Sequence, residues 1–293
     1  MSLDTISPAL HIVGYALLLL LPSAAVVFTF ARQRKRDDAA AVAPFTEMRR
    51  RPAGESLRLK LQELDGKVDE WLLLLVTTPI ILAIALTFAR APSLSALLIF
   101  FLAAAAAAAF VQSRLRPLLK ERRNYKLGFQ GERFVAEELN QLLRDGYEIF
   151  HDAPFGTYNI DHVLVGPNGV FAVETKTRRK PFSEAGEKQY KVSLTGEALQ
   201  FPNCRDTDSV DQIRRNVKSL AQWLTSATGD RTTVVGIIAI PGWSVTPYAD
   251  AELIVINPRQ ARSYIVGRSG ARLDPAQIQR ACHQLEERCK LPI

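Results

Sequence analysis

Three long runs without Asp, Glu, Lys or Arg constrain this chain more than any other feature. They cover residues 10–31, 71–89 and 91–113. About 20 apolar residues in a helix cross a hydrocarbon core of roughly 30 Å, so each run is long enough to span a membrane. Only a short segment around Arg90 separates the second run from the third, which favours a tight helical hairpin. We therefore expect a membrane region over residues 1–113, with three transmembrane helices.

Basic residues beside these runs predict the orientation. Several Arg and Lys follow the first run at 32–36 and the third run at 114–123, whereas the leader carries only Asp4. Lys and Arg are enriched on the cytoplasmic side of membrane helices. We therefore expect the N-terminus outside the inner membrane, and both the loop 32–70 and all residues after 113 in the cytoplasm. A cleaved signal peptide fits less well, because its basic residues would precede the apolar run. Membrane lipid is thus an expected partner.

After a basic linker at 114–127, the pattern becomes that of a globular domain over 128–293. The predicted elements are a helix at 131–144; strands at 147–151, 158–165 and 170–177; a small hairpin at 188–201; a helix at 208–226; strands at 232–240 and 252–256; and a helix at 275–290. This order predicts a mixed α/β domain with a core of its own. The three cysteines show no CxxC spacing, which argues against a disulfide scaffold and against a structural zinc site.

The chemistry centres on Asp161 and Glu174, which lie on two strands joined by the turn Gly166–Gly169. Pro167 cannot adopt the positive φ that two-residue hairpin turns require, so we expect a four-residue turn. Gly166 then faces Gly169, and Asp161 faces Glu174. Directly opposed residues have Cβ atoms about 4.5–5.5 Å apart, so the two carboxylates would meet. A three-residue turn would instead shift the register and separate them.

Two opposed carboxylates need a compensating charge. Together with a backbone carbonyl, such as that of Thr175, they suit Mg²⁺ or Mn²⁺. A metal-held water can attack phosphorus, and Lys176, on the same strand face as Glu174, could position or deprotonate that water. The competing interpretation is a surface Asp and a Glu–Lys pair on a solvated strand. The apolar neighbours Val163 and Val173 favour the metal site.

At this point the sequence resembles the nuclease-related domain (NERD) family of the PD-(D/E)xK nuclease superfamily. The resemblance covers roughly residues 125–225. It rests on Gly131-Glu132 at a helix start, Ile160-Asp161-His162, the block GVFAVETK at 169–176, and Gln212 in a helix. The family implies a restriction-endonuclease-like fold, in which helices flank a mixed sheet. The chain departs from the family in lacking the common Asn-Pro shortly before the helix glutamine.

The resemblance also implies roles for individual residues. Asp161 and Glu174 would bind the metal, and Lys176 would be the catalytic lysine. Glu132 would complete the site through metal or water, and Gln212 would orient water or a phosphate oxygen. The implied reaction is metal-dependent hydrolysis of a phosphodiester, with DNA as the substrate by family analogy alone.

Basic residues near these positions are candidates for nucleic-acid contacts, in a chain of net charge +7. They follow the site strand and occupy the Gln212 helix: Arg178, Arg179, Lys180, Arg214, Arg215 and Lys218. A solvated strand end is the alternative for the first three residues. Basic residues near a membrane also help to set the orientation of a membrane protein. This is the alternative explanation for the basic residues of the Gln212 helix.

Three classes of function follow. The first is a membrane-anchored nuclease, with endonuclease and exonuclease action both open. The second is a weak or inactive nuclease-fold module that binds nucleic acid or a protein partner at the membrane. The third assigns the function to the spans, but they contain no Asp, Glu, Lys or Arg and only one histidine, His11, so anchoring is the simpler interpretation. The small residues Ala103–Ala109 could pack helices closely, which leaves the oligomeric state open.

Overall fold

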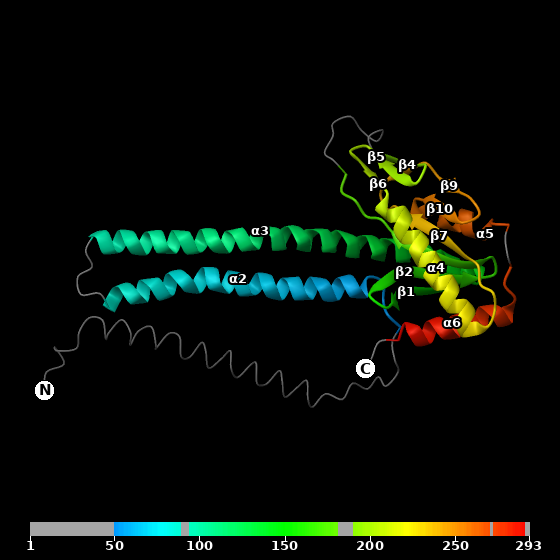
Figure 1. Cartoon of the computed structure of the whole chain (residues 1–293), viewed down its shortest axis with the longest axis horizontal. Coiled ribbons are helices and arrows are strands. Elements are labelled where there is room, and N and C mark those ends of the chain that lie inside the picture. The colour runs from blue at the N-terminus through cyan, green and yellow to red at the C-terminus, as the bar shows by residue number, and fades with distance from the viewer. Residues whose placement is uncertain (1–49, 89–93, 181–189, 270–271, 291–293) are drawn as a thin grey trace, which may run out of the picture. The chain divides into compact units, whose positions relative to one another are not determined.

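The computed structural model describes residues 50–88, 94–180, 190–269 and 272–290, which form two compact units. The described part of the first unit, the hairpin unit, lies within Leu64–Lys120. The second, the α/β unit, combines the segment ending at Glu63 with the chain from Glu121 onward. Figure 1 shows the elements of both units. The predicted first membrane helix, 10–31, lies outside the described residues.

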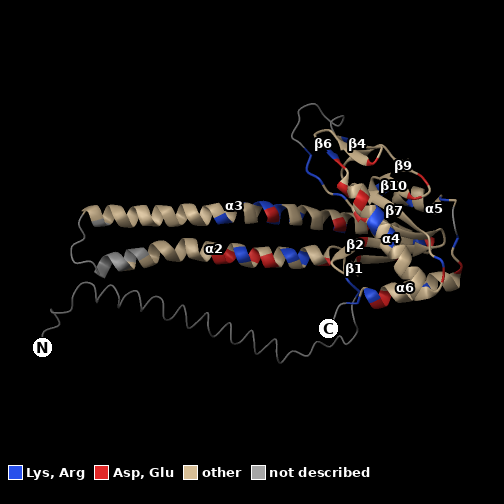
Figure 2. Cartoon of the chain, viewed as in Figure 1, with Lys and Arg blue, Asp and Glu red and all other residues tan. Residues whose placement is uncertain are grey.

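Two long helices, α2 (Glu55–Phe88) and α3 (Leu94–Leu139), form the hairpin unit and continue into the α/β unit. Within the hairpin unit, Trp71 on α2 meets Phe110 on α3 edge to face, with ring centroids 5.9 Å apart. In α3, Lys, Arg, Asp and Glu are absent from residues 94–113, as Figure 2 shows, and in α2 they are absent after Glu70. Large apolar side chains on both stretches are exposed, Phe101 among them.

The expectation of three transmembrane helices is supported for one helix only. Within the part of the chain that the structure describes, the stretch Leu97–Asp145 is long and apolar enough to cross a membrane. The second predicted run forms the end of α2, where Thr77, Thr78 and Pro79 interrupt the apolar residues.

Two predicted connections are helical in the structure. Residues 55–70, expected in a loop, are the first turns of α2, and the linker 114–127 lies within α3. Charged residues of opposite sign three positions apart favour such helices, as in the 2.9 Å ion pair between Lys60 and Glu63. The charged residues therefore limit the apolar parts of α2 and α3, but the helices continue through them.

A six-stranded mixed sheet forms the centre of the α/β unit, in the order β1-β2-β3-β7-β10-β9. Its strands are β1 (Glu148–Phe155), β2 (Tyr158–Gly166), β3 (Gly169–Thr175), β7 (Val234–Ala239), β10 (Leu253–Ile256) and β9 (Tyr248–Ala249). Strands β1, β2 and β3 are antiparallel neighbours, whereas β3, β7 and β10 run parallel. A second sheet contains β6 (Cys204–Asp206), β5 (Ala198–Phe201), β4 (Lys191–Thr195) and β8 (Ser244–Val245).

Helices cover both faces of the six-stranded sheet. Helices α4 (Asp208–Thr228) and α6 (Pro275–Arg288) pack on the face that carries Val163 and Ala172. The end of α3, the 3-10 helix η2 (Asn140–Asp145) and α5 (Ala261–Val266) pack on the face that carries Leu164 and Phe171. A short 3-10 helix, η4 (Pro258–Gln260), precedes α5. The predicted mixed α/β fold with flanking helices is thus confirmed.

The β2–β3 hairpin has the predicted register but a shorter turn. Gly166 pairs with Gly169 and His162 with Val173, which places Asp161 opposite Glu174 one step further along. The turn contains two residues, Pro167 and Asn168, and not the expected four. Gly169 has φ 119°, a conformation that only glycine adopts readily, so the chain reverses without forcing Pro167 to positive φ.

A short segment before α3, residues 50–63, belongs to the α/β unit, and we call it the N-terminal clasp. The backbone N–H of Arg51 donates to the carbonyl of Cys289 at 2.9 Å, just after α6. Arg51 also forms an ion pair with Asp152 on β1, and the Ser56 hydroxyl donates to the same carboxylate at 2.6 Å. The clasp therefore joins the first turn of α2 to the sheet.

Candidate active site

Asp161 and Glu174 lie on adjacent strands, on the sheet face covered by α4. The backbone N–H of Thr175 donates to Asp161 Oδ2 at 2.7 Å. The side chain of Asn216, on α4, donates to Glu174 Oε2 at 3.1 Å. Each carboxylate is thus held by one donor, while Glu174 is only 5% exposed. The alternation of side chains along the strands brings together the two residues that the sequence predicted as metal ligands.

The pKa values of both carboxyl groups are raised. Burial raises the pKa of Asp161 to about 7, against the opposing effects of the Thr175 N–H and the Lys176 ammonium. Burial and the charge of Asp161 together raise the pKa of Glu174 well above its ordinary value. Shifts of this kind arise where buried like charges lack a cation that matches them.

Glu132, near the end of α3, is the third carboxylate of the site. Its side chain is buried, and its Oε2 atom has no hydrogen-bond partner among the described residues. Burial raises its pKa to about 9, with the charges of Asp161 and Asp152 adding to the effect and the backbone N–H of Gly54 opposing it. The helix therefore places a third carboxyl group within the electrostatic influence of the two on the sheet. We refer to Glu132, Asp161 and Glu174 as the acidic site.

Lys176 lies just beyond β3, and its backbone N–H donates to the carbonyl of Ala239 at 2.9 Å. Its ammonium lies 3.5 Å from Asp206 Oδ2, at the end of β6. Asp206 in turn accepts bonds from the backbone N–H and the hydroxyl of Ser209, at 3.1 and 3.0 Å. Lys176 is thus held beside the acidic site by a carboxylate that has its own fixed partners.

The sequence analysis missed two residues of this arrangement. Asp206 positions Lys176, and Asn216, rather than Gln212, is the α4 residue that contacts Glu174. Gln212 lies one helical turn before Asn216 and is partly buried, but no hydrogen bond joins it to the acidic site within the described chain. The spacing of four residues was the available signal, because residues i and i+4 share a helix face.

The predicted metal ligand Thr175 takes a different part. Its hydroxyl lies 3.3 Å from Nε2 of His162, on the sheet face away from the acidic site, so only its backbone can serve the site. His162 is buried, and its Nδ1 lies 2.9 Å from Nδ1 of His151. Burial lowers the pKa of His151 to about 4.

His151 and Asp152 were expected at a strand end, but they lie in the middle of β1. The β1–β2 register pairs His151 with His162 and Ala153 with Ile160, which makes Asp152 the cross-strand neighbour of Asp161. Asp152 has φ 49° and is only 1% exposed. No local pattern around Asp152 indicated its importance, because its partners in the clasp are about 100 residues away.

The chemistry of the acidic site fits Mg²⁺ or Mn²⁺. Both cations prefer oxygen ligands. The site offers three carboxyl groups with raised pKa values, and one of their atoms, Glu132 Oε2, has no hydrogen-bond partner among the described residues. Within the described residues, no three His, Cys, Asp or Glu side chains form a ready-made metal cage. Mg²⁺ does not require one, since it keeps several waters and binds through one or two carboxylates together with substrate phosphates.

The basic residues after β3 adopt three different arrangements. The Arg178 guanidinium contacts the sulfur of Cys204 and lies 5.0 Å from the centre of the Phe201 ring. Arg179 donates to the backbone carbonyl of Arg123 at 3.1 Å. Lys180 is exposed, with Nζ 4.4 Å from the centre of the Tyr190 ring. Lys180 is therefore the most available of the three for a nucleic acid.

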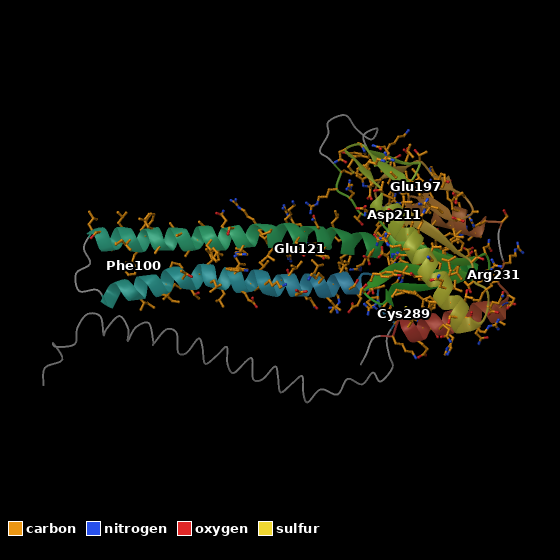
Figure 3. The ribbon with its side chains drawn as sticks, viewed as in Figure 1. Phe100, Glu121, Glu197, Asp211, Arg231 and Cys289 are labelled. Atoms are coloured by element: carbon orange, nitrogen blue, oxygen red, sulfur yellow. The ribbon has the colours of Figure 1, made fainter. Side chains whose placement is uncertain are left out.

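The basic residues of α4 do not form a single track. Arg214 forms an exposed ion pair of 2.8 Å with Glu197, which Figure 3 labels, and lines a separate cavity of about 260 Å³ together with Lys218. Arg214 and Lys218 lie on the helix flank opposite Gln212, whereas Arg215 is exposed on the same flank as Gln212. Only Arg215 thus continues the surface that carries the acidic site.

Comparisons with known proteins identify one family match, which spans the acidic site. The family model of the nuclease-related domain matches residues 127–241. No curated protein and no solved structure matches the chain. The matched residues include all five predicted catalytic positions and exclude both the hairpin unit and the clasp. The predicted resemblance is thereby confirmed, and residues 127–241 match the nuclease-related domain (NERD) family.

Proposed function

We propose that this protein is a membrane-anchored, metal-dependent nuclease that hydrolyses phosphodiester bonds of DNA in the cytoplasm. The observation that carries the proposal is the acidic site. It has three carboxyl groups with raised pKa values, of which Glu132 and Glu174 are buried and Asp161 is partly buried, next to a lysine that is held by a separate carboxylate. The match to a nuclease-related family supports the same reaction.

Asp161 and Glu174 would hold the metal ion, and Glu132 would bind it directly or through water. When bound, the ion supplies an activated water and stabilises charge on the phosphoryl oxygens. Lys176 would orient the attacking water and offset the negative charge that develops on the phosphate. Asp206 would hold Lys176 in place, and Asn216 would hold Glu174. In the reaction, water adds its oxygen to phosphorus, the ester P–O bond breaks, and the departing oxygen takes up a proton.

Membrane anchoring rests on the hairpin unit. Apolar side chains surround the distal parts of α2 and α3 and are exposed, as expected of helices in contact with lipid. Arg114, Arg116 and Lys120 follow the apolar part of α3 and would mark the cytoplasmic side. Membrane fractionation with carbonate extraction tests the anchoring, and protease protection of tagged termini tests the orientation.

The full chain in detergent, with Mg²⁺ or Mn²⁺, tests the reaction. The substrates are single-stranded DNA, duplex DNA and RNA, and the controls are EDTA, Asp161→Asn and Lys176→Met. Metal-dependent cleavage that both variants lose would support the proposal. Binding without cleavage would favour the alternative of an inactive nucleic-acid-binding module. Neither binding nor cleavage would refute both functions.

A further inference from the structure

A cavity of about 480 Å³ lies beside the acidic site. Its wall includes Gly131 and Thr177, which directly precede Glu132 and follow Lys176 in the sequence. These two residues touch so closely that a Cβ atom at Gly131 would overlap the Thr177 hydroxyl. The cavity is therefore lined by the immediate chain neighbours of Glu132 and Lys176, so a ligand in the cavity would lie close to the acidic site.

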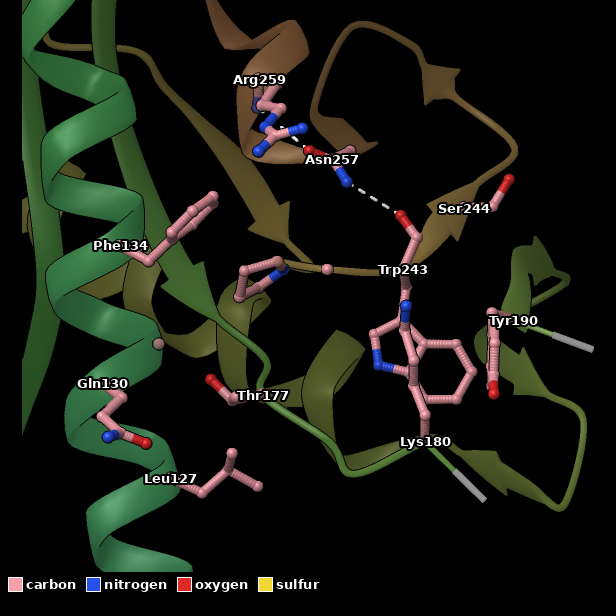
Figure 4. A pocket seen from close by; sticks show the side chains of 13 residues that line it. Leu127, Gln130, Phe134, Thr177, Lys180, Tyr190, Trp243, Ser244, Asn257 and Arg259 are labelled. Carbon is pink, nitrogen blue, oxygen red and sulfur yellow. Dashed lines mark hydrogen bonds between the residues drawn. The ribbon is translucent and has the colours of Figure 1, made fainter. Parts of the chain in front are cut away.

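Aromatic rings line two opposite sides of this cavity. Figure 4 shows Phe134 pointing into it from α3, with Tyr190 and Trp243 on the far side. Trp243 is fixed: its indole N–H donates to the carbonyl of Arg178 at 3.1 Å, and its ring packs against Phe201 at 5.1 Å. Tyr190 meets Trp243 edge to face at 6.1 Å. The packing around Trp243 therefore fixes one of the two aromatic sides of the cavity.

Each aromatic side also carries a cation. Lys180 Nζ lies 4.4 Å from the centre of the Tyr190 ring, and the Arg259 guanidinium lies 5.8 Å from the centre of the Phe134 ring. Arg259 is largely exposed, and Glu138, at 3.4 Å, offsets part of its charge. The Thr177 hydroxyl is buried without a hydrogen-bond partner among the described residues. The cavity therefore offers flat rings, positive charge and polar groups at once.

These features fit one kind of ligand. A purely apolar molecule would contact the rings but would not pair with the two cations. A free phosphate would pair with the cations but would not stack on the rings. A nucleobase has a flat π face for the rings and is attached to phosphates for the cations. A base within a duplex is stacked and paired, so it can enter such a cavity only after leaving the stack.

We propose that this cavity binds an unpaired nucleobase of the substrate strand, next to the phosphodiester at the acidic site. The inference rests on the proposed nuclease function for the position of the reacting phosphate, although binding in the cavity can be measured without cleavage. It predicts that single-stranded nucleic acid, or a strand opened near the cut, is preferred over an intact duplex.

The test uses the full chain in detergent with EDTA, which prevents metal-dependent cleavage. The probes are short single-stranded DNA and RNA oligonucleotides that carry the fluorescent base 2-aminopurine, and the matching duplexes. Tyr190→Ala and Phe134→Leu should each weaken single-strand binding roughly tenfold, the usual scale for loss of one base–aromatic stack. Phe134→Leu retains an apolar side chain of similar size, and thermal melting checks that it still folds.

A second tyrosine provides the matched control. Tyr248 is also partly exposed and lines the separate cavity of about 260 Å³ beside Arg214. Tyr248→Ala should leave the affinity for the single strand and the quenching of 2-aminopurine unchanged. Equal losses for DNA and RNA would assign the cavity to the base itself, and a loss for one of them would assign it to that substrate.

The outcomes separate the two proposals. Cleavage by the natural sequence, with single-strand binding unaltered in Tyr190→Ala and Phe134→Leu, would overturn the base site and retain the nuclease. Quenching that both variants abolish, without cleavage by any form, would support the base site and overturn the nuclease. Equal affinity of the natural sequence for single strands and duplexes would also overturn the base site.

Discussion

Two buried carboxylates in the α/β unit, Asp152 and Glu132, differ in how their charge is met. Asp152 accepts hydrogen bonds from Arg51 at 2.9 and 2.5 Å, from the Ser56 backbone and hydroxyl, and from Asn159 at 2.9 Å. Glu132 Oε2 accepts none within the described chain, and the pKa of Glu132 is raised to about 9. The two carboxyl groups are close enough for the charge of Asp152 to raise that pKa further.

This difference separates a structural carboxylate from a functional one. A buried charge with fixed partners stabilises the arrangement that surrounds it, whereas a buried carboxyl group without partners stays protonated until a cation arrives. Asp152 joins the clasp to β1 through its hydrogen bonds, whereas Glu132 Oε2 in the acidic site has no partner among the described residues. The comparison therefore predicts that removing a partner of Asp152 lowers the stability of the fold, whereas removing a carboxylate of the acidic site lowers activity and does not lower stability.

The largest effect is expected on catalysis. Asp161→Asn and Lys176→Met should each lower the rate of DNA cleavage about 10³-fold or more, because they remove a metal ligand and the cation beside it. In EDTA, Asp161→Asn should not lower the free energy of unfolding, since it removes repulsion among buried carboxylates. The matched control is Glu137→Gln, an exposed carboxylate on the same helix as Glu132. Full activity in Asp161→Asn would contradict the assignment.

The next effect concerns stability. Arg51→Ala should lower the free energy of unfolding by about 3–5 kcal/mol, because it leaves Asp152 as a buried charge with its main partner removed. The neighbouring Arg50 forms ion pairs with Glu148 and Glu286 that are close to half exposed, so Arg50→Ala should cost about 1 kcal/mol or less. Urea unfolding of both variants measures the difference. An equal loss of unfolding free energy in both variants would contradict the expectation that the buried ion pair contributes more than the exposed ones.

Lowering the pH should reduce the stability that His151, on β1, contributes. The folded pKa of His151 is about 4, below its ordinary value of 6.5, so the unfolded chain binds more protons between these two pH values. The contribution of His151 to the free energy of unfolding should therefore fall by about 3 kcal/mol as the pH drops from 6.5 towards 4, whereas the raised pKa values of the acidic site act in the opposite direction. His151→Gln should flatten this dependence, whereas the exposed His283 should leave it intact when replaced by Gln. Parallel pH curves for the natural sequence and His151→Gln would contradict the expectation.

The smallest expected effect is stabilisation by the metal. At ten times its dissociation constant, Mg²⁺ should raise the free energy of unfolding by about 1.4 kcal/mol, because it binds the folded acidic site. The rise should disappear in Asp161→Asn and persist in Arg50→Ala. Thermal melting at constant ionic strength, with and without EDTA, provides the measurement. A rise that is equal in Asp161→Asn would place the ion elsewhere.

Local patterns predicted much of the α/β fold. The helix expected at 208–226 is α4, the strand expected at 158–165 is β2, and the segment Ala198–Phe201 is β5. These elements have clear periodicity and strong turn signals at their ends. The structure also contains β6, β8, β9 and α5, which the sequence analysis did not identify. Three of these are strands of two or three residues, too short to show a period, and the fourth is a helix of fewer than two turns.

The acidic site was predictable where one hairpin determines it, and less so where separate segments meet. The register that opposes Asp161 and Glu174 follows from a single turn, and the structure has it. Asp206, Asn216 and Asp152 instead depend on how β6, α4 and the clasp pack on the sheet. Nothing within a few residues of them encodes those contacts. Tertiary packing, rather than local preference, selected their partners.

The clasp has one more consequence, for how the protein can be divided. Residues 50–63 precede the hairpin unit and residues from 121 follow it, so the apolar hairpin is an insertion within the α/β unit. Two separately expressed chains, divided between α2 and α3, would each carry part of one folding unit and should assemble by complementation. A fragment that starts after the hairpin would lack Arg51 and Ser56, so Asp152 would lose its hydrogen bonds to the clasp and keep the one from Asn159. A soluble form of the protein is better made by replacing the hairpin with a short linker between the clasp and the end of α3.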